Sequence, residues 1–90
     1  MLDKATALRE ILRILDNMHT GESLQLLTWK GDRSLLLQKM ATEDILVTES
    51  GYVNETQLVP LTKIRKVVKK LLKREFPRSH KIRTKIIQQP

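Results

Sequence analysis

The chain of 90 residues contains no cysteine, and aromatic residues make up only 3% of it. Without cysteine it can form neither a disulfide framework nor a thiolate metal site, which favours a cytoplasmic location. Because Trp29, Tyr52 and Phe76 are its only aromatic side chains, the core must be built from Leu, Ile and Val. Proteins that bind single-stranded nucleic acid normally expose several stacking aromatics, so the sequence disfavours that class.

Glycine, histidine and long apolar runs are also scarce. The three glycines stand at least ten residues apart, so no glycine-rich phosphate loop can form. His19 and His80 lie 61 residues apart, which argues against a transition-metal site. No apolar run approaches the roughly 18 to 20 residues of a membrane span, and the start of the chain lacks the pattern of a targeting segment. We therefore expect a soluble protein that is not an enzyme, with no catalytic residues, metal or cofactor.

Positive charge is abundant, and it is concentrated in one part of the chain. Residues 1–60 contain six basic and nine acidic residues, a net charge of −3. Residues 61–90 contain eleven basic residues and one acidic residue, a net charge of +10. Such asymmetry indicates an anionic partner, which can be nucleic acid, an acidic protein or an acidic membrane surface. A solvated helix face that improves solubility is the alternative explanation.

Hydrophobic periodicity predicts the secondary structure. Leu8, Leu12 and Leu15 recur at the spacing of an amphipathic helix over residues 2–18. Beyond residue 21 the period falls from about 3.6 to about 2, which predicts strands at residues 24–29, 35–40, 45–48 and 52–59. Gly31-Asp32 is typical of a two-residue hairpin between the first two strands. The stripe from Ile64 to Phe76 predicts a second helix between two prolines.

This order of elements predicts an α+β fold. It comprises an N-terminal helix, a three- to four-stranded antiparallel meander and a basic C-terminal helix, with both helices on one face of the sheet. Residues 1–76 are expected to form a single compact domain. Residues 77–90 are expected to follow it as a basic tail, which is extended, partly disordered or added to the sheet as an edge strand.

The second helix is expected to pack through one side and to present charge on the other. On a helical wheel its lysines lie opposite Ile64, Val68 and Leu71. In the tail, the basic residues between 81 and 85 alternate with apolar or neutral ones, which would place cations about 7 Å apart on an extended chain. The expected nucleic-acid-binding residues are Lys63, Lys66, Lys69, Lys70, Lys73, Arg74, Arg78, Lys81, Arg83 and Lys85.

The favoured function is a non-catalytic module that binds DNA or RNA mainly through the phosphate backbone. Lysine neutralises phosphates, whereas base edges are read mostly by Asn, Gln and Arg, so recognition of a specific sequence is not expected. The alternative is a protein-interaction module that binds an acidic partner or forms a homodimer through a sheet edge. Peripheral membrane binding is a further alternative, provided that the apolar side of the second helix is exposed to lipid.

Overall fold

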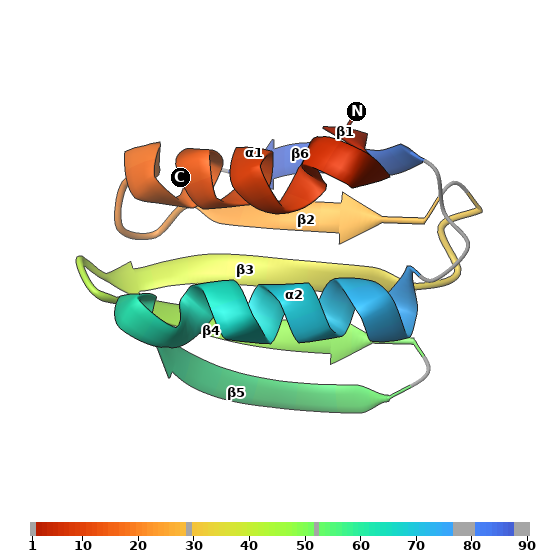
Figure 1. Ribbon diagram of the computed structural model, residues 1–90. Helices are drawn as coiled ribbons and strands as arrows, with labels where there is room; N and C mark the ends of the chain where they lie inside the picture. The colour runs from red at the N-terminus through yellow and green to blue at the C-terminus, as the bar shows by residue number, and fades with distance from the viewer. Residues whose placement is uncertain (1, 29, 52, 77–80, 88–90) are drawn as a thin grey trace.

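The computed structural model describes residues 2–28, 30–51, 53–76 and 81–87 of the chain (Figure 1). It contains two α-helices and six strands, with four consecutive strands between the helices, and a short 3-10 turn precedes the second helix. In chain order the elements are β1 (Leu2–Asp3), α1 (Lys4–Asn17), β2 (Ser23–Leu27), β3 (Ser34–Ala41), β4 (Asp44–Ser50), β5 (Asn54–Pro60), η1 (Leu61–Lys63), α2 (Ile64–Glu75) and β6 (Lys81–Ile87).

All six strands belong to one antiparallel sheet with the order β1-β6-β2-β3-β4-β5. Strands β2 to β5 form a four-stranded meander, and β6 returns to pair with β2 on its other side. The predicted α+β class and the antiparallel meander are confirmed. The sheet is larger than predicted because β6 and the two-residue β1 extend it beyond the meander.

Both helices lie on one face of the sheet, as predicted (Figure 1). Helix α1 covers the half that contains β6 and β2, and α2 runs in the opposite direction over the half that contains β4. The aliphatic core fills the space between the two layers. Its fully buried aliphatic members come from both helices and from four strands and include Ile11, Leu15, Leu24, Leu26, Leu35, Leu37, Ile45, Val68 and Ile82. The aromatic Phe76, just after α2, is completely buried with them. No helix covers the other face of the sheet within the described ranges.

The first hairpin differs from the two-residue turn predicted at Gly31-Asp32. Regular pairing ends at Thr28 and Arg33, where the Thr28 N–H donates to the Arg33 carbonyl oxygen at 3.1 Å. Gly31 has a φ of 74°, a left-handed conformation that glycine adopts easily, and its N–H donates back to the Thr28 carbonyl oxygen. The Thr28 hydroxyl also donates to the Asp32 carboxylate at 2.6 Å. These bonds stabilise a longer loop, and the hydrogen bond from the Thr28 hydroxyl lowers the pKa of Asp32.

Lys39 ties the sheet to the end of α1. It lies on the inner side of β3 and is only 7% exposed, and its ammonium group donates to the Leu15 carbonyl oxygen at 3.1 Å. The last turn of α1 contains no basic residue of its own. Because the carbonyl end of a helix carries partial negative charge, a cation from a neighbouring strand stabilises it. Lys39 therefore acts as a C-terminal cap supplied by tertiary structure.

Candidate functional site

Helix α2 exposes only cationic residues to solvent. Its exposed positions are Arg65, Lys66, Lys69, Lys70 and Lys73, and Lys63 in the preceding 3-10 turn is exposed as well. We refer to these six residues as the basic face. The single acidic residue of α2, Glu75, is 1% exposed and lies on the opposite side of the helix. None of the lysines of the basic face forms an ion pair with another residue that the structure describes.

The other side of α2 is held firmly against the sheet. Ile64, Val68 and Leu71 are at most 3% exposed, and Phe76, just after the helix, is completely buried. The predicted division of this helix into a packed side and a charged side is therefore confirmed. Because the apolar stripe contributes to the core, it is not available to insert into lipid. The basic face is consequently carried on a well-anchored helix.

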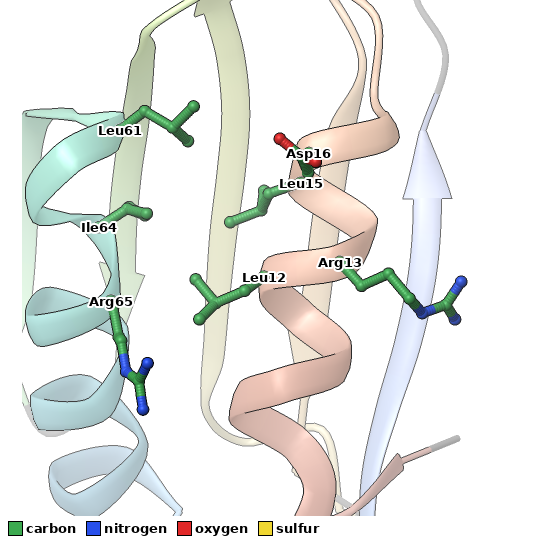
Figure 2. Close-up of a pocket in the computed structure, with 7 residues that line it drawn as sticks. All are labelled: Leu12, Arg13, Leu15, Asp16, Leu61, Ile64 and Arg65. Carbon is green, nitrogen blue, oxygen red and sulfur yellow. The ribbon is translucent and has the colours of Figure 1, made fainter.

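Arg65 belongs to the basic face, although it was not among the binding residues expected from the sequence. It lies at the border of an open groove of about 410 Å³ between the two helices, shown in Figure 2. The apolar walls of this groove are formed by Leu12, Leu15, Leu61 and Ile64. In Figure 2 the Arg65 side chain extends from α2 along the side of the groove. The groove therefore adds an apolar recess next to the cationic surface.

Arg74, one of the expected binding residues, forms an ion pair with another side chain of the protein. Its Nε and Nη2 atoms donate to the two carboxylate oxygens of Glu49 at 2.8 and 2.6 Å. These hydrogen bonds and the charge of Glu49 raise the pKa of the Arg74 guanidinium. Such a planar bidentate pair holds the side chain in one orientation. Arg74 thus fixes the end of α2 to β4, and the basic face is defined without it.

Two buried carboxyl groups lie at this same end of α2. Glu49 is 2% exposed and faces Glu75, whose carboxylate accepts a hydrogen bond from the Val53 N–H at 3.1 Å. Arg33 approaches Glu75 at 4.0 Å. Burial raises the pKa of Glu49 above its ordinary value, and its hydrogen bond with Glu75 raises that pKa further, whereas the bonds from Arg74 oppose the change. This cluster joins strand β4, the residue before β3 and the residue before β5 to α2, and it positions the basic face.

The basic residues of β6 do not adjoin the basic face. Strand β6 alternates between Ile82, which is completely buried under the helices, and the exposed residues Lys81, Arg83 and Lys85. Successive side chains of a strand point to opposite faces, so these three cations lie on the helix-free face of the sheet. The structure therefore divides the basic C-terminal region between two faces of the molecule. The segment after residue 76 was expected to be extended, partly disordered or an added strand. Its residues 81–87 form a strand of the sheet.

The remaining expected site residue, Arg78, lies outside the described residues. Trp29 and Tyr52, the two aromatic candidates for stacking on bases, lie outside them as well. Within the described ranges, no group of three or more His, Asp or Glu side chains is arranged to hold a metal ion. No helix in those ranges is long and apolar enough to cross a membrane.

The fold and site thus define a small α+β domain with an uninterrupted cationic helix face. Comparisons with protein-family models, with curated proteins and with solved structures find no match to this chain. The chemistry of its own side chains is therefore the basis for assigning a function.

Proposed function

We propose that the protein is a non-catalytic nucleic-acid-binding module that contacts the phosphate backbone through the basic face of α2. The observation that carries this proposal is that every exposed residue of α2 is Arg or Lys. Like charges three and four residues apart repel one another by a few tenths of a kcal/mol per pair. A polyanion relieves this repulsion, and the charges cost less in the bound state than in the free protein.

The spacing of the lysines suits a chain of phosphates. Lys66, Lys69 and Lys73 follow one line on the helix and span about 10 Å at the α-helical rise of about 1.5 Å per residue. The flexible lysine side chains can reach successive phosphates from this line without a fixed register. The basic face contains five lysines and one arginine. Their chemistry favours contact with the backbone over recognition of base edges.

Fluorescence anisotropy titrations with duplex DNA, duplex RNA and single strands test the proposal. At about 50 mM salt we expect binding, with affinity falling steeply towards about 200 mM because each contact releases a counterion. With four to six contacts, the slope of log K against log salt should lie between about −4 and −5. If none of the three nucleic acids binds at the lower salt concentration, the proposal is overturned, whether or not the protein binds anionic lipid vesicles.

Matched variants test the location. The double variant K69Q/K70Q removes two charges from the basic face, and R9Q/K30Q removes two exposed charges from α1 and the first hairpin. We expect the first variant to weaken binding to all sequences similarly and to reduce the salt slope by about 2, because about 0.9 is lost per contact. The second should change the slope by less than about 1. Equal effects of the two variants would mean that binding responds only to net charge.

A further inference from the structure

Strand β5 forms one edge of the sheet, and among the described residues about half of its backbone groups have no strand to pair with. Its register with β4 places Pro60 opposite Asp44, and the Leu61 N–H donates to the Glu43 carbonyl oxygen at 2.6 Å just beyond this pair. Hydrogen-bonded and non-hydrogen-bonded pairs alternate in an antiparallel ladder. The N–H and C=O groups of Asn54, Thr56 and Leu58 therefore point away from β4. All three residues are exposed.

This edge differs from the other side of the sheet in how it is protected. Natural edges are blunted by charged side chains, bulges or proline. Strand β6 pairs with β1 through its first two residues. It carries the charged residues Lys81, Arg83 and Lys85. Strand β5 has an unbroken register with β4, its one charged residue is Glu55, and its proline, Pro60, is its last residue. Its exposed residues include Leu58, whose exposed fraction of 58% is the highest among the large exposed hydrophobic residues.

We infer that β5 is the contact surface for a second copy of this chain, paired antiparallel about a two-fold axis at Thr56. Thr56 then lies opposite its own counterpart, and Asn54 lies opposite Leu58 of the second copy. The three outward-pointing residues of each strand together form about six hydrogen bonds across the axis. In this register Glu55 faces Gln57 of the second copy, so no like charges oppose each other. Pro60 lies beyond the paired region and limits slippage.

The two-fold axis closes the assembly at two copies. An isologous contact uses the same strand of both chains and leaves no further β5 edge, whereas pairing of β5 with β6 would produce an open filament. The axis is perpendicular to the sheet, so both α2 helices lie on the same face. Since α2 covers β4, the two helices lie about three strand spacings apart, or about 14 Å. The dimer therefore unites two basic faces on one surface.

Sedimentation equilibrium in the absence of nucleic acid tests this inference independently of the proposed function. The wild-type mass should rise from 10.5 kDa to twice that value as concentration increases. The variant T56K places two ammonium groups opposite each other at the axis, and we expect it to weaken the dimer by about tenfold. Its control is T48K, which adds the same charge on the same face directly opposite Thr56 in β4. Circular dichroism establishes that both variants are folded.

Three results would overturn the dimer. One is a wild-type protein that remains at 10.5 kDa at every concentration up to about 1 mM, well above the Kd of a weak specific contact. Another is equal weakening by T56K and T48K, since the second residue lies one strand away from the axis. The third is growth beyond two copies, which would indicate a heterologous contact. If the dimer forms but nucleic acid does not bind, the inference stands and the proposed function fails.

Discussion

Arg74 and Glu49 form a bidentate ion pair, with Arg74 Nη2 2.6 Å from Glu49 Oε1 and Arg74 Nε 2.8 Å from Glu49 Oε2. The pair joins α2 to β4 although the two residues are 25 positions apart in the sequence. Glu49 also faces Glu75, so two carboxyl groups share one buried site with the guanidinium. A site of this composition makes the stability of the domain depend on pH.

We expect the contribution of Glu49 to stability to decrease as the pH rises. Its pKa is raised above the ordinary value of 4.5, chiefly by burial, so the folded state holds this proton more tightly than the unfolded chain does. The resulting stabilisation is complete below pH 4.5 and is lost as the pH rises through the raised pKa. Urea denaturation between about pH 4 and 7 should show a smaller fall in stability for E49Q than for the wild type.

The lowered pKa of Glu10 acts in the opposite direction, because its carboxylate is stabilised by hydrogen bonds from Arg13. That contribution is the same in the wild type and in E49Q, so it cancels in the difference between them, which reports on the site that Glu49 shares with Glu75. Identical pH profiles for the two proteins would show that Glu49 has the same proton affinity in the folded and unfolded states.

Local patterns predicted the two sides of α2 but not its ion pair. The positions of Ile64 and Lys66 around the helix follow from its 3.6-residue repeat, which the sequence contains in full. Arg65 lies at the boundary between the two sides, and its exposure depends on the distance between α1 and α2. The partner of Arg74 depends on where β4 lies. A useful signal was nevertheless present, since Glu49 continues the inward alternation of Ile45 and Val47 and therefore requires a buried partner.

The spacing of the basic residues after position 80 predicted a strand-like segment, and its neighbours could not be derived from it. Alternation fixes only which side chains share a face. The pairing of β6 with β2 also requires the chain to return across the sheet after α2. That return moved Lys81 and Lys85 away from the helix lysines, which are close to them in the sequence but lie on the other face of the molecule.

Gly51 should not tolerate a larger side chain. A Cβ atom at this position would lie 2.5 Å from the Glu75 carboxylate and 3.0 Å from the Arg33 side chain. Since Glu75 is buried and bonded to the Val53 N–H, its carboxylate cannot move freely. We expect G51A to lower the free energy of unfolding by about 1–3 kcal/mol, measured by urea denaturation. The control S50A, at the exposed neighbouring position, should stay within about 0.5 kcal/mol, and an equal effect of the two would contradict this steric account.

Replacement of Lys39 should loosen the end of α1. The variant K39M keeps most of the side-chain volume and removes the hydrogen bond to the Leu15 carbonyl oxygen, so we expect a loss of about 1 kcal/mol. Hydrogen exchange of the Met18 amide, which also donates to that carbonyl, should accelerate. K30M, at an exposed loop position, is the matched control. A more stable K39M would mean that the cost of burying the charge exceeds the value of the cap.

Strand β6 should contribute to the stability of the whole domain. Ile82 is completely buried, whereas Ile86 on the same strand is 51% exposed. We expect I82A to lower the free energy of unfolding by about 2–4 kcal/mol, and I86A by less than about 1 kcal/mol. Both values can be measured by thermal or urea denaturation. Similar small losses for the two variants would indicate that residues 81–87 are dispensable to a core formed by residues 1–76.

The separation of the two groups of cations leads to a test of which face contacts nucleic acid. The variant K66Q/K69Q/K73Q removes three charges from the basic face, and K81Q/R83Q/K85Q removes three from the opposite side of the sheet. A rigid duplex that lies along α2 cannot reach the far side of the sheet, so the first variant should reduce the salt slope by about 2–3 and the second by less than about 1. Anisotropy titrations at several salt concentrations give both values. An equal or larger reduction for the second variant would place the binding surface on β6 and refute the assignment to α2.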